Sequence, residues 1–379
     1  MRLQIDWGEI LDISPKDKRL KLLVALGGCV VLTIIFTLMF GFEVHDDKQQ
    51  KKIGFINIGG IEEPGWSNAH YEGLKAACEK FGLELLYRDH IEENSGQCPE
   101  AIEELLAEGA GMIFLASYNY PIESKSIIAE NKHIEFATNS SEVHLRNMTS
   151  YFARMYQGRY LSGALAGLRT KSNVIGYVAA MPNSEVNRGI NAFTLGVQRV
   201  NPNAKVVVMW TGSWRNDEVE AAHARRLIEQ AHADVLTYHQ DYIASVDVAD
   251  ELGVDYIAYN IELDNRSEHY LTSVVCRWDI FYEKMLQLYL RKELPSVKNY
   301  WLGMKQGVIK LSDYSPAVTP EQQQKIEALS QEILNDKQIF SGKLYDNQGN
   351  LKCNDGEAIS ENVLLERMNC LVRGAEVLE

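Results

Sequence analysis

The sequence predicts an α/β protein with two doubly wound parallel-sheet lobes joined by a hinge, preceded by one N-terminal transmembrane helix. Three observations lead to this prediction. Strand-like and helix-like segments alternate from residue 52 onward, they do so in two consecutive series, and an uncharged apolar run precedes both. With 379 residues, 46% of them hydrophobic, the chain is long enough for two cores.

The apolar run extends from Leu22 to Phe42 and contains no charged residue. At about 1.5 Å per residue, its length matches the roughly 30 Å hydrocarbon core of a bilayer. Basic residues precede the run within residues 16–21, and acidic residues follow it. The positive-inside rule therefore predicts a short cytoplasmic segment over 1–21, an anchor over 22–42 and a polar linker over 43–52, with the rest of the chain exported.

Two alternatives to an uncleaved anchor stay open. A cleaved signal peptide has a shorter apolar region and a small-residue cleavage site, whereas this run ends in MFGFEV. Lipidation at Cys29 is suggested by the sequence LGGC, although thirteen largely apolar residues follow that cysteine. We favour the anchor, which places a binding domain outside the cytoplasm on a single-pass membrane segment.

The first series of elements predicts lobe 1 over residues 53–150. Buried parallel strands are expected at the apolar runs, and helices at the amphipathic segments between them. The expected strands are 52–59, 83–88, 112–117 and 133–139, and the expected helices are 67–81, 98–108 and 122–130.

The second series predicts lobe 2 over residues 151–259. Its expected strands are 173–180, 205–212, 234–240 and 255–260, and its expected helices are 154–169, 185–200, 215–232 and 245–252. We expect about 260–296 to return to lobe 1, about 297–318 to belong to lobe 2, and 319–379 to form a C-terminal helix and tail that pack on the lobes.

Ligands of open parallel sheets bind beyond the carboxyl ends of the strands. Aromatic and polar residues gather there: a tryptophan follows the first strand of one lobe and the second strand of the other. Aromatic faces stack on planar heterocycles, and amides and carboxylates read their edges. The expected ligand-binding residues are Trp66, Trp214, Tyr118, Asn139, Glu63, Glu185, Asp241 and Asn260.

Composition and motifs exclude several functions. The formal charge of −14 argues against binding to nucleic acid, and the lack of a glycine-rich phosphate cradle argues against a nucleotide. The six cysteines show no zinc spacing, so no metal or cofactor is expected; Cys353 and Cys370 could form a disulfide. No motif of a hydrolase is present, and His239 at a strand end is expected to be structural.

Three stretches carry a resemblance to a known family. EEPGWSNAHYEGLKAA, SYFARMYQGRYLSGALAG and NVIGYVAAMPNSEVNRGINAFTLGVQRVNPNAKV resemble the basic membrane protein family, as does the tail IFSGKLYDNQGNLK. The resemblance covers about Lys52 to Glu379. It implies a type I periplasmic-binding fold and an ABC-transporter component that presents a purine nucleoside or free purine base to a permease.

The same resemblance implies roles for individual residues. Trp66 and Trp214 match the aromatics that stack on the base, Asn139 matches a polar position after the fourth strand, and Glu62 or Glu63 matches an acidic one after the first. The ribose-binding Asp and Lys of nucleoside binders correspond to Asn260 and Cys276. Because both ribose contacts are changed, the sequence favours an adenine-like base over a nucleoside. A ligand-sensing ectodomain and, more remotely, a nucleoside hydrolase are the alternatives.

Overall fold

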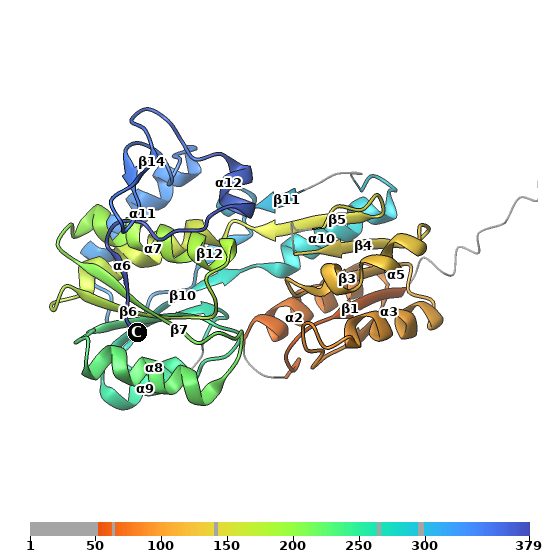
Figure 1. The fold of residues 1–379 in the computed structure, drawn as a ribbon, viewed down its shortest axis with the longest axis horizontal. Coiled ribbons are helices and arrows are strands. Elements are labelled where there is room, and N and C mark those ends of the chain that lie inside the picture. Colours follow the sequence, from red (N-terminus) through yellow and green to blue (C-terminus); the bar gives the residue numbers. More distant parts are fainter. Residues whose placement is uncertain (1–51, 63–64, 140–142, 264–266, 295–298) are drawn as a thin grey trace, which may run out of the picture. The chain divides into compact units, whose positions relative to one another are not determined.

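The computed structural model describes residues 52–62, 65–139, 143–263, 267–294 and 299–379. The predicted cytoplasmic segment and anchor, residues 43–51 of the predicted linker and Glu63 lie outside these ranges. Among the described residues, no helix is both long and apolar enough to cross a membrane. Residues 49–379 form one compact unit, which contains both sheets (Figure 1).

The first sheet has six parallel strands in the order β11-β5-β4-β3-β1-β2. Its central strands are short apolar runs whose side chains are buried on both faces, as expected of a parallel sheet covered by helices. In sheet order, the strands span Asn299–Leu302, Met148–Ala153, Glu135–Thr138, Met112–Leu115, Lys52–Ile56 and Glu84–Arg88.

The second sheet has seven strands in the order β12-β10-β9-β8-β6-β7-β15. All neighbours are parallel except β12, which runs antiparallel to β10. In sheet order, the strands span Ile309–Leu311, Tyr270–Cys276, Asp255–Asn260, Val235–His239, Val174–Ala179, Lys205–Trp210 and Ala375–Val377.

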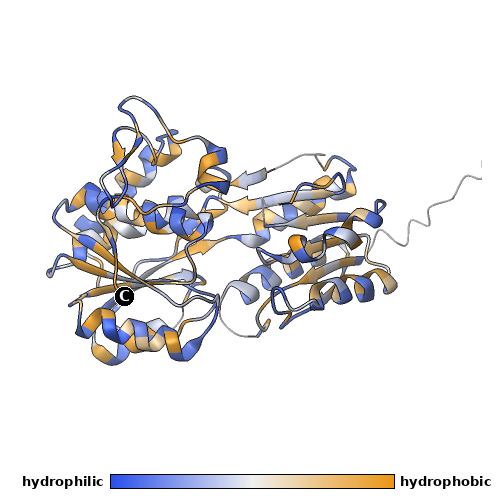
Figure 2. Cartoon of the chain, in the orientation of Figure 1, coloured by the Kyte–Doolittle hydropathy of each residue, from blue (hydrophilic) through white to orange (hydrophobic). Residues whose placement is uncertain are grey.

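Helices cover both sheets; apolar and polar residues alternate along the helices, whereas the strands are mostly apolar (Figure 2). The buried apolar residues of helices and strands form the cores. In lobe 2 the pair α6 and α7 lies on the opposite side of the sheet from α8 and α9 (Figure 1). The helices of the first sheet are α2 Trp66–Phe81, α3 Gln97–Ala107, α4 Tyr120–Glu123, α5 Lys125–Glu130 and α10 Trp278–Leu290; those of the second are α6 Met155–Arg169, α7 Ser184–Val200, α8 Asp217–Glu229 and α9 Ala244–Leu252.

Local sequence signals set several helix boundaries. Asn183 and Asn216 cap α7 and α8, accepting from the backbone amides of Val186 and Val219. Gly82 ends α2 in the left-handed region at φ 64°. Helix α2 is an exception at its start, because Gly65 at the N-cap has no side chain and no acidic residue lies in the first turn.

The chain passes between the sheets three times: from β5 to α6, from β10 to α10, and from β11 to β12. Backbone hydrogen bonds tie the crossings together. The Arg154 amide donates to the Leu302 carbonyl at 2.6 Å, and the Arg277 amide donates to the Val308 carbonyl at 2.7 Å. The two lobes are thus joined by three adjacent chain crossings.

The crossings differ from those expected in the sequence. We expected residues 260–296 in the first lobe, but β10 within that range pairs with β9 in the second sheet, and only α10 returns to pack on α2. Within 297–318, β11 adds to the first sheet beside β5 and only β12 joins the second. Strand β5, which begins at Met148, was not expected either. Apolar strands carry no signal for the sheet they join, because this depends on tertiary pairing.

The C-terminal tail packs on the second lobe and completes its sheet. Helix α11, Pro320–Leu334, begins with a capping box between Thr319 and Gln322 and packs on α6. A hairpin of β13 Leu344–Tyr345 and β14 Leu351–Cys353 follows, and then α12 Glu361–Glu366 contacts α7. Strand β15 then pairs with β7. Cys353 and Cys370 are free thiols in this structure, so the disulfide that the sequence allowed is not formed.

Candidate functional site

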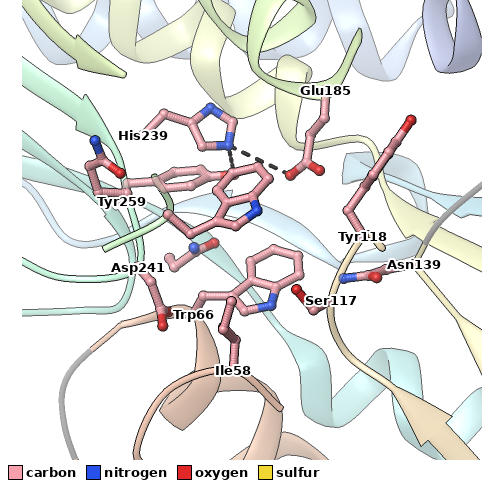
Figure 3. Close-up of a pocket in the computed structure, with 12 residues that line it drawn as sticks. Ile58, Trp66, Ser117, Tyr118, Asn139, Glu185, His239, Asp241 and Tyr259 are labelled. Atoms are coloured by element: carbon pink, nitrogen blue, oxygen red, sulfur yellow. Dashed lines mark hydrogen bonds and ion pairs between the residues drawn. The ribbon is translucent and has the colours of Figure 1, made fainter. Parts of the chain in front are cut away.

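A cavity lies between the two lobes at the carboxyl ends of their strands. It contains about 380 Å³ of free space, part of it continuous with solvent. Figure 3 shows Glu185 and His239 above Trp66, with Ser117, Tyr118 and Asn139 at its side. Its lining comprises Ile58, Trp66, Ser117, Tyr118, Asn139, Glu185, Trp214, His239, Gln240, Asp241, Tyr259 and Asn260.

Trp66 forms one wall of this cavity from the first turn of α2. Its indole Nε1 donates to the Ala116 carbonyl at 3.0 Å, which fixes the ring next to the end of β3. The ring packs against His70 at 4.1 Å and edge-on to Trp278 at 5.5 Å between centroids. The indole is therefore held in place by its own lobe before any ligand arrives.

Trp214 comes from the opposite lobe, in the loop between β7 and α8. Its ring lies 6.3 Å from that of His239, and its carbonyl accepts from the Asp241 amide at 2.8 Å. The Trp214 Nε1 is buried and has no hydrogen-bond partner. One indole from each lobe thus lines the cavity, and one of them retains an unused donor.

Two buried asparagines add unpaired polar atoms. Asn139, after β4, is 8% exposed and its Oδ1 has no partner; Asn260, at the end of β9, is 2% exposed and neither its Oδ1 nor its Nδ2 has one. Asn260 has a left-handed backbone at φ 69°, a conformation that asparagine tolerates better than most residues. Because a buried unsatisfied polar group costs about 1–3 kcal/mol, these atoms are suited to bind a polar ligand edge.

Glu185 supplies the carboxylate of the cavity. It stands in the first turn of α7, its side chain is 11% exposed, and its Oε1 lies 3.6 Å from His239 Nε2. Burial raises the pKa of Glu185 to about 7, while Arg188 pulls it down. Burial also lowers the pKa of His239 well below its usual value, so this histidine is neutral at neutral pH. The Tyr259 hydroxyl is 3.3 Å from the same His239 Nε2.

Asp241 links the two lobes. Its Oδ1 accepts from the Ser67 amide at 3.1 Å, and its Oδ2 accepts from the Ser67 hydroxyl at 3.2 Å. A Cβ at Gly65 would lie 1.7 Å from the Asp241 carbonyl oxygen, so only glycine allows this approach. Asp241 therefore caps α2 from the other lobe, in the place of the N-cap side chain that α2 lacks. Burial raises the pKa of Asp241 to about 6, against the opposing effect of the Ser67 hydrogen bonds.

Seven of the eight residues expected at the site line this cavity: Trp66, Trp214, Tyr118, Asn139, Glu185, Asp241 and Asn260. The eighth, Glu63, lies outside the described residues. Glu62 is exposed, and Cys276 is buried at the end of β10, outside the cavity lining.

The sequence did not assign five of the lining residues to the site. Ser117, His239 and Gln240 stand at strand ends, and this position in the sequence could have identified them as lining residues. Ile58 lies beside a strand and Tyr259 lies in one. The apolar pattern of the sequence predicts only that such residues are buried in the core. Among the described residues, no group of three or more His, Cys, Asp or Glu could hold a metal ion.

The family model described as ABC transporter substrate-binding protein PnrA-like matches residues 50–343. A purine-binding protein of Brucella abortus is 28% identical over 92% of this chain and 99% of its own length. A putative ABC transporter glucose-binding protein of Haloferax volcanii is 31% identical over 85% of this chain and 79% of its own.

Solved structures support the same fold. An ABC transporter solute-binding protein of Aeropyrum pernix superposes with a TM-score of 0.64 at 16% identity, over 75% of this chain and 91% of its own. Its likeness concerns the two-lobed fold alone. The family model covers most of the chain, including every strand of both sheets except β15 and every residue of the cavity lining. The chain therefore belongs to the PnrA-like family of ABC transporter substrate-binding proteins, and it is a binding protein rather than an enzyme.

Proposed function

We propose that this protein captures a purine, as a free base or a nucleoside, between its two lobes and delivers it to an ABC permease. The observation that carries the proposal is the cavity wall, which has Trp66 from one lobe and Trp214 from the other. Stacking of a base on an aromatic side chain contributes about 1–3 kcal/mol, and a planar heterocycle can stack on two such walls. The purine-binding name of the Brucella abortus relative supports the same ligand class.

The polar atoms of the cavity fit the edge of a heterocycle. Asn139 and Asn260 offer amide oxygens, and Asn260 and Trp214 offer N–H donors, all buried and unpaired. A purine edge presents both donors and acceptors, whereas a hydrocarbon would leave these atoms unsatisfied. Of the positions that match the ribose contacts of nucleoside binders, Asn260 is neutral and Cys276 lies outside the cavity lining. Both features favour a base over a nucleoside.

Glucose is the second candidate, because the Haloferax volcanii relative carries that name at 31% identity. Aromatic walls and amide side chains also suit a sugar ring and its hydroxyls. Isothermal titration of the purified full-length protein with adenine, guanosine, adenosine, inosine and D-glucose separates the candidates. Heat with one or more purines and none with glucose is expected. Heat with glucose alone would replace purine by sugar, and no heat with any purine would refute the proposal.

We also propose that residues 22–42 anchor the protein in the cell membrane, with the cavity on the extracytoplasmic side. The uncharged run and its basic flank support this topology. Extraction of membranes with alkaline carbonate should leave the full chain in the pellet. A chain without residues 1–42 should move to the supernatant, and processing at Cys29 would appear as a lipid-modified, shortened product by mass spectrometry.

A further inference from the structure

A second cavity adjoins the one between the tryptophans. The two share Tyr118, Asn139 and Glu185 in their lining, and the second contains about 320 Å³ of free space, part of it continuous with solvent. Beyond the shared residues, its walls include Phe152 of β5, Arg188 of α7 and Trp301 of β11. We call this space the Arg188 chamber. Both lobes line it, and it adjoins the space between the tryptophans, so a group about the size of one water molecule can reach it from a ligand lying there.

Arg188 is a buried cation that lacks a close carboxylate. It is 4% exposed, and no carboxylate of the described chain lies within ion-pair distance of it. Its Nη1 donates to the carbonyl oxygens of Leu364 at 2.5 Å and Ser184 at 3.5 Å. Nε and Nη2 form no hydrogen bond with any other described residue. At least three of the five guanidinium N–H donors are therefore unused.

Aromatic faces stabilise this charge only in part. The guanidinium carbon lies 5.4 Å from the ring centre of Phe152 and 5.3 Å from that of Trp301. Burial lowers the pKa of Arg188, while Glu185 acts on it in the opposite direction. A buried charge is costly unless hydrogen-bonded acceptors surround it, so the chamber favours an occupant that supplies acceptors.

Trp301 adds a second unused donor. It is 7% exposed, and its Nε1 is buried without a hydrogen-bond partner. The chamber therefore has unused donors on Arg188 and Trp301. The unpaired Asn139 Oδ1 and the Glu185 carboxylate are acceptors that it shares with the main cavity. The unused donors that its own walls add distinguish it from the space between the tryptophans.

From this geometry we infer that the Arg188 chamber binds a hydrogen-bond-accepting, oxygen-bearing group of the ligand, attached to the ring that lies between Trp66 and Trp214. The inference rests on the proposed function and deepens it. Two sources share this chemistry, a carbonyl oxygen of the purine ring and the hydroxyl oxygens of a ribose. Adenine itself has neither.

Four ligands test the inference with the full-length protein: adenine, hypoxanthine, adenosine and inosine. They combine the absence or presence of a ring oxygen with the absence or presence of a ribose. Arg188→Met removes the charge and the donors but keeps most of the stem. We expect its dissociation constants for the oxygen-bearing ligands to rise roughly tenfold or more, with that for adenine unchanged within about twofold. A loss shared by hypoxanthine and inosine assigns the ring oxygen, and one shared by adenosine and inosine assigns the ribose.

The matched control is Arg199→Met in the same helix, whose side chain is 52% exposed and which should bind all four ligands like wild type. Trp301→Phe keeps an aromatic side chain but lacks the Nε1 donor, so it should show the same selectivity with a smaller effect. If Arg188→Met does not fold, the selectivity of Trp301→Phe among the four ligands tests the inference in its place. An equal loss for all four ligands, or no loss, overturns the inference while leaving purine binding intact. Binding of adenine alone by wild type also overturns it. If wild type binds none of the four, the proposed function fails, and the inference with it.

Discussion

Trp214 lines the cavity and is only partly buried, whereas Trp278 is 1% exposed in the core, so Trp214 contributes less to the fold than Trp278 does. We predict that Trp214→Ala weakens purine binding by about 1–3 kcal/mol, because one stacking wall is lost. Titration calorimetry measures the change. Trp214→Phe, which keeps an aromatic face, should recover most of the affinity; an unchanged affinity for the alanine variant would show that Trp214 does not stack on the ligand.

Glu185 makes stability depend on pH in a defined direction. Its pKa is raised to about 7 from an ordinary value of 4.5, so the folded state holds its proton more tightly than the unfolded chain. The stability linked to this proton is fully present below pH 4.5 and is lost as the pH rises through about 7, at about 1.4 kcal/mol per pKa unit.

We therefore predict that Glu185→Gln, which cannot titrate, flattens the fall in stability between pH 5 and pH 8. Denaturant unfolding of wild type and variant at both pH values gives the difference in unfolding free energy. Glu220 provides a comparison for Glu185 at a site away from the cavity. Burial also raises the pKa of Glu220 to about 7, but Glu220 does not line the cavity. If wild type and Glu185→Gln lose the same stability over this range, Glu185 does not titrate as the structure indicates.

At the scale of elements, α6 and α7 approach each other unusually closely. A Cβ at Gly163 would lie 2.0 Å from the Phe193 carbonyl oxygen, and one at Gly196 would lie 2.0 Å from that of Tyr160. Both obstacles are backbone atoms, so the helices would have to separate. Helix α7 carries Glu185 and Arg188, so the close contact between α6 and α7 also positions these two lining side chains.

We predict that Gly163→Ala lowers the unfolding free energy by about 1–3 kcal/mol, the range typical of overpacked cores, and lowers ligand affinity as α7 shifts. Thermal unfolding and titration calorimetry provide the two readings. Gly189→Ala in α7 is the matched control for stability, since its Cβ would meet side chains rather than backbone, the His239 ring at 3.1 Å and the Tyr177 hydroxyl at 3.6 Å, and a milder loss of stability is expected. Equal melting temperatures for Gly163→Ala and wild type would contradict the close packing.

For the whole molecule, we expect closure of the lobes to depend on the helix cap by which Asp241 of one lobe bonds to Ser67 of the other. The N-terminus of α2 carries a partial positive charge, and Asp241 of the other lobe supplies the carboxylate that it lacks. Ligand binding and this cap both stabilise the closed state, so each should strengthen the other.

We predict that Asp241→Asn weakens ligand binding by roughly tenfold through less favourable closure, and speeds hydrogen–deuterium exchange of the amides at the start of α2 in the presence of ligand. Mass spectrometry of the exchanged full-length protein measures the second effect. Glu251→Gln, which breaks only an exposed ion pair with Arg225, should change neither. Unaltered exchange at Ser67 in Asp241→Asn would mean that the cap does not hold the lobes together.

Much of this protein could be predicted from the sequence because the relevant signals are local. Alternating apolar and amphipathic segments predicted most of the helices and strands. Ligands of parallel sheets bind at the carboxyl ends of the strands, and this rule pointed to seven of the residues that line the cavity. Asn183 at the start of α7 and Thr319 with Pro320 at the start of α11 set those boundaries, since these two caps involve neighbouring residues only.

Only the tertiary structure decided how those pieces are used. It assigned β10 and β11 to opposite sheets, since an apolar strand is compatible with either. It engaged Asp241 with Ser67 of the other lobe, although its sequence position suggested a ligand contact like the others. It also placed Arg188 and Trp301, distant in sequence, around one chamber. These outcomes depend on which surfaces meet when the chain folds, and hydrogen bonding and burial between distant residues leave no periodic trace in the sequence.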